Sequence, residues 1–526
     1  MSKDFNLLDE PWLPVRLADG RIEMLGLLEV FSRSAEITAL AETAPPSLVA
    51  QYRLLLAILH RALKHAYPQG WKDKDRAHWW RDGFPIEVVN AYLEHWRERF
   101  WLFHPEHPFM QVAALASCTE TQTLYPPNTI SLEQFYGSEI FNQDVYKCDS
   151  WHPGYVIKSM LGYFQFVPGG FFPGKKLKES EKSGALANTA AIIPAGGNLA
   201  QTLLLSLHKW TSYEDLPAWE RAAPTLPELR GAPVLATGPN DRYTRQSRAV
   251  LLRREADGRV RWLHFAAGLA LEEDSNAPDP MVSFHTDTEG NLVQISFMEG
   301  RAFWRDLPVL VPNPQKKNSQ PAAVLNHAMA LHAELEFDQV YQPLLVAGLA
   351  SNKAKLLRWR LERINLPISL MKNADRALYL CDLVEKSEKL FGELHVLAVD
   401  MLMCVIERSD RKNLRESKNN EKKAYKRMLS ALDAMPFAAS YFAYVEHALP
   451  HALELLTKGE FSEVTAYWDD VLRKAATISW EQVFIGLGCS IIALRVEARL
   501  YPGFHTLLNK HLKKPESNPV YKEAAA

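Results

Sequence analysis

Two histidines and a glutamate are crowded into the stretch His104-Pro105-Glu106-His107-Pro108-Phe109-Met110-Gln111. These residue types can bind a metal, but the familiar zinc-binding pair needs both histidines on one face of a helix. Pro105 and Pro108 fix φ at their own positions and bias the two preceding histidines away from the helical conformation. The stretch therefore predicts a rigid corner that packs Phe109 and Met110 into the core, in preference to a metal site.

A glycine-rich loop, Val167-Pro168-Gly169-Gly170-Phe171-Phe172-Pro173-Gly174-Lys175-Lys176, is a second place where chemistry could occur. Gly169 to Lys175 has the G-x-x-x-x-G-K spacing of a phosphate-binding loop. Lys176 stands where such a loop needs Ser or Thr for Mg²⁺, and Pro173 removes a backbone N–H. A nucleotide-binding enzyme that uses Gly169–Lys176 is therefore an alternative, beside an ordinary turn that the glycines permit.

No further set of residues indicates catalysis. Serines and histidines are scattered without the context of a nucleophile elbow or a triad. None of the cysteines pairs as C-x-x-C, so neither a zinc knuckle nor a disulfide framework is indicated. The cysteines are Cys118, Cys148, Cys381, Cys404 and Cys489. We expect no catalytic residue, no bound metal and no cofactor.

Positive charge gathers locally, although the formal net charge of the chain is −2. That balance argues against coating nucleic acid by bulk attraction, but phosphate contacts depend on local patches. Three segments contain such a local positive patch, and each can also be explained as ordinary structure that does not contact phosphate. Arg259–Trp262 fits simple alternation on a hairpin strand, and Gly348–Lys355 fits a solvated start of a helix. The run from Arg408 to Arg427 fits a solvated face or loop.

The elements that must position these segments change in character along the chain. Residues 1–370 mix strand-like stretches, such as Trp12–Arg16 and Val260–Phe265, with a helical pattern over Ser47–Ala66 that follows two prolines. Tyr92–Phe103 is read as an aromatic helical segment. The 526 residues exceed one ordinary domain, so we expect a large mixed α/β N-terminal domain over 1–370.

Residues 371–526 have few prolines and a helical period, which predicts a C-terminal helical bundle of four main helices with short connections. The helical candidates are Ala374–Glu407, Glu421–Met435, Phe437–Thr457, Glu463–Ile478 and Trp480–Tyr501. The fold class is thus expected to be α+β. No apolar run reaches the roughly 18 residues of a membrane span, and the N-terminus lacks a signal pattern, so we expect a cytoplasmic protein with no membrane partner.

Two motifs together carry a resemblance to a known family. Asn6-Leu7-Leu8-Asp9-Glu10-Pro11-Trp12-Leu13-Pro14-Val15-Arg16 is similar to the opening N-L-L-x-x-x-W-x-P-V-R strand of the CasA family, the large subunits of type I-E CRISPR Cascade surveillance complexes. The H-x-E-H-P-F-M-Q turn of that family follows about ninety residues later, as residues 104–111 do here. Between the motifs the similarity is weak, but the chain length also suits the family.

The resemblance implies a non-catalytic subunit of an RNA-guided antiviral complex. Such a subunit recognises the protospacer-adjacent motif through the minor groove, helps to open duplex DNA for R-loop formation and recruits a helicase-nuclease in trans. Its partners would be the crRNA-bound Cascade subunits, the double-stranded target DNA and the displaced non-target strand. A purely architectural scaffold that binds proteins and no DNA is a further alternative.

The resemblance also assigns residues. Gly169 and Gly170 correspond to a glycine loop that approaches the minor groove in the family. Arg261 corresponds to a family lysine that lies seven residues before a glycine. Asn352 matches the Asn of a wedge tip, whereas Lys353 replaces the Gln of that wedge. Expected phosphate contacts are Lys175, Lys176, Lys355, Arg411, Lys412, Arg415, Lys422 and Lys423.

Overall fold

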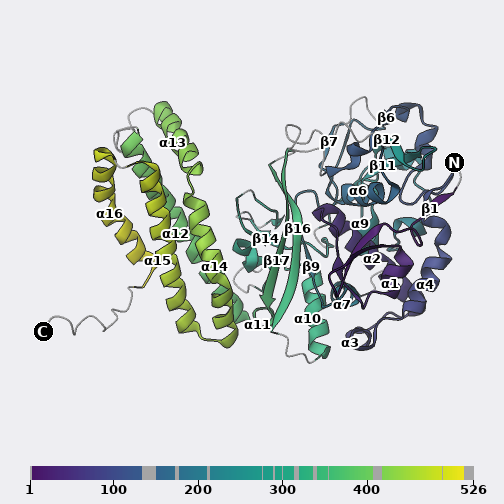
Figure 1. Ribbon diagram of the computed structural model, residues 1–526, viewed down its shortest axis with the longest axis horizontal. Helices are drawn as coiled ribbons and strands as arrows, with labels where there is room; N and C mark the ends of the chain where they lie inside the picture. The colour runs from purple at the N-terminus through teal and green to yellow at the C-terminus, as the bar shows by residue number, and fades with distance from the viewer. Residues whose placement is uncertain are drawn as a thin grey trace. The chain divides into compact units, whose positions relative to one another are not determined.

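The computed structural model of the chain contains two compact units, each of which is drawn in Figure 1. It describes residues 3–132, 150–171, 177–209, 214–274, 277–287, 289, 291–298, 300–312, 319–335, 340–352, 355–406, 418–488 and 490–513. Unit 1 consists of residues 1–310 and 316–368, and unit 2 consists of residues 311–315 and 369–526. Within the described parts of the chain, no helix is long and apolar enough to cross a membrane.

Helix α2 (Pro45–Ala66) runs through the interior of unit 1. Its first residues are Pro45 and Pro46, whose fixed φ suits the first turn, and every residue from Pro45 to Lys64 is buried. Helix α6 (Pro153–Phe166) packs against it, and a Cβ on Gly162 would lie 2.9 Å from Ser47 N, so glycine permits this close approach. Buried Arg53 donates to Gln165 and pairs with Asp279, which ties α2 to distant parts of the chain.

Shorter helices surround this core. They are α1 (Leu27–Ser32), α3 (Asp73–Asp82), α4 (Ile86–His95), α7 (Leu199–Ser206), α8 (Leu226–Arg230), α9 (Pro239–Thr244) and α10 (Ala323–Leu335). The 3-10 turns are η1 (Arg97–Arg99), η2 (Ala113–Ala116), η3 (Thr119–Thr121), η4 (Pro127–Ile130), η6 (Ala218–Glu220) and η7 (Phe303–Val309). The helix expected over Tyr92–Phe103 is therefore wrong beyond His95. Trp101–Phe103 instead forms a strand, β5, that pairs with β1 (Asp4–Asn6).

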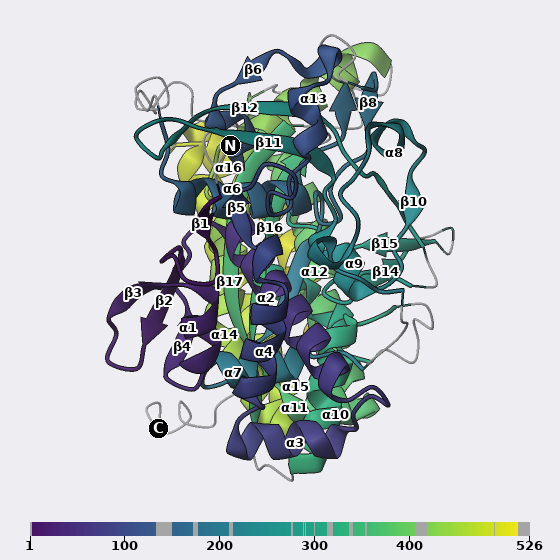
Figure 2. The same cartoon turned by 90° about the vertical axis from the view of Figure 1, so that its right-hand side faces the viewer.

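The strands of unit 1 form small sheets. A three-stranded sheet has the order β3 (Ile22–Leu25), β2 (Leu13–Leu17), β4 (Ile37–Leu40), and it forms the left edge of the unit in Figure 2. A second has the order β11 (Arg248–Arg254), β12 (Val260–Ala267), β6 (Leu124–Tyr125), and a third β17 (Lys355–Pro367), β16 (Tyr341–Asn352), β9 (Ala190–Pro194). The strand pairs are β7 (Gly170–Phe171) with β8 (Ser180–Glu181), β10 (Val234–Leu235) with β13 (Leu271–Glu272), and β14 (Phe284–Thr286) with β15 (Leu292–Gln294).

Unit 2 is helical. After the short α11 (Ile368–Lys372), its helices are α12 (Ala374–Ile406), α13 (Lys418–Asp433), α14 (Phe437–Lys458), α15 (Phe461–Gly486) and α16 (Ile491–His511). Helices α13 and α14 follow one another in the same direction across the short break at Ala434-Met435-Pro436 and together form one rod of the bundle (Figure 1). The predicted α+β class, with mixed structure first and a helical bundle last, is confirmed.

A buried polar contact joins three rods of the bundle. Trp468 of α15 is fully buried, and its Nε1 donates to the carbonyl of Leu383 at 2.9 Å and to Ser387 Oγ at 3.1 Å, both on α12. Tyr441 of α14 donates its hydroxyl to the carbonyl of Ser387 at 3.0 Å. Because buried polar groups must be satisfied, these bonds specify one register among the helices.

The break between the last two helices differs from the expectation. A boundary was expected at residue 479, but α15 continues through Ser479 and Trp480 to Gly486. The chain turns where Gly488 adopts a φ of +73°, and Ser490 then caps α16 by accepting a hydrogen bond from Ala493 N. Ser479 does not end the helix because its hydroxyl, buried in the bundle, donates to the carbonyl of Phe437.

Candidate nucleic-acid interface

The two glycines of the predicted loop occupy different environments in the β7–β8 hairpin. Gly170 lies opposite Glu181 and is exposed, and a Cβ added to it would meet no atom within 4 Å. Gly169 is half-buried, and a Cβ there would lie 3.1 Å from Ser183 N. A side chain at Gly169 would therefore be tightly packed, whereas Gly170 leaves an open face of backbone. Lys175 and Lys176 lie outside the described residues.

A buried arginine fixes the base of this hairpin. Arg248 is the first residue of β11 and is 3% exposed. Its Nη1 donates to the carbonyl of Lys182 and its Nη2 to the carbonyl of Pro168, each at 2.8 Å. Pro168 precedes β7 and Lys182 follows β8, so one guanidinium holds the two arms of the hairpin together. Sequence reasoning missed Arg248, for which the only signal is a cation at the start of an apolar strand.

The surroundings of the glycines do not match a phosphate-binding loop. Such a loop leaves a strand and opens a helix, whose N-terminus and backbone N–H groups hold the phosphates. Here helix α6 precedes the glycines and strand β7 begins at Gly170. Residues 177–189 contain no helix. The described part of this segment thus gives no support to a nucleotide-binding enzyme.

Arg261 is the extra residue of a β-bulge. In the β11–β12 ladder Arg254 is paired with Val260 and Arg253 with Trp262, which leaves Arg261 without a partner residue. Arg261 and Trp262 are consecutive exposed residues, so simple in–out alternation does not explain this position. A bulge twists the strand and redirects a side chain. The result is an exposed arginine beside an exposed tryptophan near the start of β12.

Asn352 and Lys355 form the closing pair of the β16–β17 hairpin. The interpretation of residues 348–355 as the start of a helix is therefore wrong, because both arms are strands. Strand β9 pairs only with Leu344–Gly348, so the last residues of β16 pair with β17 alone and the tip extends past the sheet. Lys353 lies at this tip in sequence but outside the described residues.

The last basic segment belongs to unit 2. Arg411, Lys412 and Arg415 lie outside the described residues, while Lys422 and Lys423 lie in α13. The side chain of Lys423 is exposed, whereas Ala424 and Met428 are buried in the bundle. The described part of α13 therefore turns positive charge toward solvent.

The β7–β8 hairpin, the bulge at Arg261 and the β16–β17 hairpin all belong to unit 1. Figure 1 shows β7, β12 and the closed end of the β16–β17 hairpin toward the upper end of that unit. Figure 2 places β8 and β12 at the same end. The fold thus brings β7, β12 and the β16–β17 hairpin, which are far apart in sequence, toward one end of one unit.

The His104–Gln111 stretch is a structural corner. His104 Nδ1 accepts hydrogen bonds from Glu106 N and His107 N, and burial lowers the pKa of His104, so its imidazole is neutral. Phe109 and Met110 are buried, which confirms the predicted packing role. Gln111 donates to the carbonyl of Leu102 and accepts from Leu252 N, and so joins β5 to β11.

The most strongly perturbed histidines lie in the core, away from these segments. The rings of His60 and His208 stack with centroids 3.9 Å apart. Burial lowers the pKa of His208 to about 3 and also lowers that of His60. No group of three or more His, Cys, Asp or Glu side chains among the described residues is arranged to hold a metal ion.

Comparison with known proteins identifies the family. The family model described as CRISPR-associated protein Cse1 matches residues 6–478. The chain belongs to the Cse1 family. The resemblance to the CasA large subunits, which rested on two short motifs, is thereby confirmed, and Cse1 and CasA stand together in the description of a curated relative.

That relative is the CRISPR-associated protein CasA/Cse1 of Thermus thermophilus, which is 32% identical over 502 residues, covering 92% of this chain and 93% of the relative. The crystal structure of a Thermus thermophilus CasA superposes with a TM-score of 0.82 at 30% identity, covering 97% of this chain and 100% of the other. A structure described as a CRISPR RNA-guided surveillance complex matches at a TM-score of 0.70 and 21% identity, covering 96% and 100%. At that identity the likeness shows the shared Cse1 fold.

Proposed function

We propose that this chain is the non-catalytic, DNA-recognising large subunit of a type I-E CRISPR surveillance complex. In this role it recognises the protospacer-adjacent motif through the minor groove, helps to open the duplex for R-loop formation and recruits a helicase-nuclease. Its partners are the crRNA-bound subunits, the target duplex and the displaced strand. Membership of the Cse1 family and the likeness to a chain of a surveillance complex support this assembly.

The observation that carries the proposal is the projecting β16–β17 hairpin. Its closing residues, Asn352 and Lys355, are held by a long two-stranded ladder that extends past β9. A two-stranded projection whose closing residues are polar in sequence is suited to entering a duplex where the first base pairs must separate. Opening one step costs about 1.4 kcal/mol of stacking, so a single inserted tip can offset a useful part of that cost.

Two further features at the same end of unit 1 support minor-groove recognition. The exposed backbone at Gly170 has no side chain to prevent close approach to a groove. Arg261, redirected by its bulge, supplies a cation, and arginine is favoured in a narrow minor groove because the potential there is more negative. The guide RNA reads the target sequence, while the protein reads only the short flanking motif.

The test is to reconstitute the guide-bound complex with and without this chain and to measure duplex affinity across a library of flanking motifs. We expect the chain to raise affinity and to confer preference for a subset of motifs. An unchanged affinity and a flat motif profile would favour the architectural scaffold instead. Retention of nuclease recruitment in that case would show that the chain serves only to bind proteins.

A further inference from the structure

A small pocket of about 170 Å³ lies in unit 1 beside η6, α8 and the end of α9. Its apolar wall is formed by Ala218, Ala222, Pro224 and Leu269, and its polar end by Arg245 and Gln246. None of the residues proposed to contact DNA lines it. The pocket therefore needs an explanation of its own.

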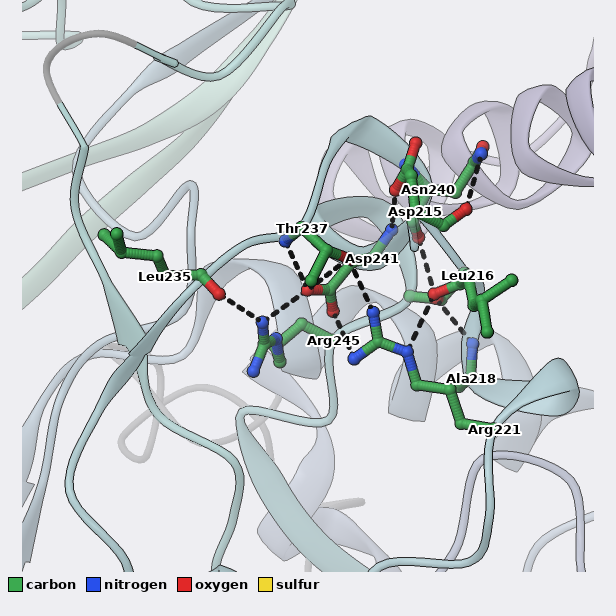
Figure 3. Close-up of polar contacts among 10 residues, drawn as sticks. Asp215, Leu216, Ala218, Arg221, Leu235, Thr237, Asn240, Asp241 and Arg245 are labelled. Atoms are coloured by element: carbon green, nitrogen blue, oxygen red, sulfur yellow. Dashed lines mark hydrogen bonds and ion pairs between the residues drawn. The ribbon is translucent and has the colours of Figure 1, made fainter. Parts of the chain in front are cut away.

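The polar end is built around a shared carboxylate, shown in Figure 3. Asp241 accepts a hydrogen bond from Thr237 N at 2.9 Å and pairs through Oδ1 with Arg221 and through Oδ2 with Arg245. Arg221 also donates to the carbonyl of Leu216 and to Thr237 Oγ1. One carboxylate faces two guanidiniums, so this group of three side chains keeps a net charge of +1.

Arg245 is the cation whose hydrogen-bonding capacity is least used. Its side chain is 6% exposed, and both hydrogen bonds recorded for it, to Asp241 Oδ2 and to the carbonyl of Leu235, come from Nη2. Its Nε is buried and meets no acceptor in the described structure. A buried guanidinium nitrogen without an acceptor is costly, so an acceptor supplied from the pocket would stabilise it.

Gln246 adds a second polar group beside that cation. It is 4% exposed, lines the same pocket, and uses its backbone carbonyl to accept from Leu269 N. The opposing charge in the lining, Glu228, lies on an exposed part of α8, where its carboxylate accepts from Thr225 N and Thr225 Oγ1. Glu228 thus has hydrogen-bond donors of its own, while the unsatisfied donor of the lining belongs to Arg245.

We propose that this pocket binds a small free oxyanion, with its carboxylate or phosphate group on Arg245 and Gln246 and its remaining atoms against Ala218, Ala222 and Leu269. Both Nη2 protons of Arg245 are already used by Asp241 and Leu235, so Nε is the buried donor left for the oxyanion, and lysine has no equivalent of that N–H. The pocket holds a ligand of only a few heavy atoms. This site is separate from the proposed DNA interface and does not depend on it.

The test uses the full-length chain and isothermal titration calorimetry with two probes, inorganic phosphate and succinate. We expect saturable binding of at least one probe, and the preferred probe identifies the oxyanion class. Arg245→Lys retains the charge but loses the unpartnered Nε–H, so it should weaken binding at least tenfold. Arg242→Lys is the matched control, because Arg242 lies on α9, is 3% exposed, and bonds instead to Glu273 and Ala277.

A second variant keeps the test informative if Arg245→Lys does not fold. Ala222 is exposed at the pocket, so Ala222→Phe should fill the space without disturbing the core and should abolish binding. Absence of binding by either probe to the wild type, or equal losses in the Arg245 and Arg242 variants, would overturn the proposal. Displacement of the bound probe by duplex DNA would also overturn it, because the pocket would then be part of the DNA path.

Discussion

Gly169 and Gly170 are neighbours in sequence, yet their surroundings give them opposite roles. A Cβ at Gly169 would press on the backbone at Ser183, whereas a Cβ at Gly170 would point into open space. Packing therefore explains the first glycine, and nothing within the described chain requires the second. A glycine that the fold does not need is a good candidate for contact with something outside the chain.

The two glycines thus provide a matched pair of variants. Gly170→Ala should leave the melting temperature within about 1 °C of wild type, because no atom lies near the added methyl, yet should weaken duplex binding by the assembled complex several-fold. Gly169→Ala should instead cost about 1–3 kcal/mol of stability by overpacking. Thermal melting and duplex affinity measured on both variants would check this, and full duplex affinity in Gly170→Ala would remove that residue from the interface.

The His60–His208 pair predicts acid sensitivity. In an unfolded chain histidine has a pKa near 6.5, whereas burial lowers the pKa of His208 to about 3 in the folded chain and that of His60 in the same direction. Below pH 6.5 the unfolded state therefore binds more protons than the folded state, which favours unfolding. Each such histidine should reduce the free energy of unfolding by about 1.4 kcal/mol per pH unit until its folded pKa is reached.

Melting temperatures from pH 7.5 to 5.0 would measure this effect. His208→Phe keeps a stacking ring but cannot take up a proton, so its melting temperature should fall less steeply with acid than that of wild type. Some dependence should remain, because burial also lowers the pKa of His327 to about 4. His447→Gln, at an exposed position of α14, is the control. Identical slopes for His208→Phe and wild type would contradict the assignment.

At the scale of elements, the length of the β16–β17 hairpin is what makes a wedge feasible. Only the middle of β16 is held by β9, so the tip is supported by its own ladder. Arg248 plays a similar part for the β7–β8 hairpin, which it holds from both sides. These two hairpins proposed to contact DNA are thus held by a ladder of their own or by a buried side chain.

The wedge is tested by Lys353→Ala in the assembled complex. If Lys353 acts where pairing must first be broken, the variant should slow opening of fully paired targets and have little effect on targets already mismatched beside the flanking motif. Lys355→Ala, as a phosphate contact, should weaken binding to both targets about equally. Affinities and opening rates for paired and pre-opened duplexes would distinguish these roles. Equal losses on both targets would reduce Lys353 to a phosphate contact.

At the scale of the whole molecule, charge is locally concentrated but balanced overall. With a formal net charge of −2, the isolated chain should bind DNA weakly and without sequence preference. Phosphate contacts release counterions, so that binding should fall steeply between about 50 and 200 mM salt. Electrophoretic or fluorescence titrations across this range would check it. Tight, salt-insensitive and sequence-selective binding would show that recognition does not require the guide complex.

The division into two compact units leads to a prediction about folding. We propose that the helices after residue 369 form a unit that survives on its own once released. Limited proteolysis should cut first near residues 368–373 or in the basic stretch 408–423, before it cuts inside the packed helices. Mass spectrometry of the early fragments would show this. Early cleavage inside α15, between residues 461 and 486, would contradict it.

Much of this protein can be predicted from local patterns. The prolines of the His104–Gln111 stretch disfavour a helix there whatever surrounds them, so the corner can be predicted locally, and the apolar Phe109 and Met110 are buried as expected. Helical periodicity after residue 371 identifies the bundle in the same way. Two separated motifs were enough to recognise the Cse1 family, because each combines several constrained residue types at fixed spacing.

Features that depend on distant partners were decided only by the tertiary structure. The sequence predicts a helix boundary at Ser479, but in the structure its hydroxyl donates to the carbonyl of Phe437 in a neighbouring helix. The sequence also suggests simple alternation at Arg261, whereas the register between β11 and β12 places this residue in a bulge. The role of Arg248, and the pairing of Arg221 and Arg245 on one carboxylate, likewise have no local signature. Sequence alone determines the conformations that a segment favours through its own local interactions. The pairing of buried charges and the register of strands depend instead on residues that are distant in sequence and that folding brings into contact.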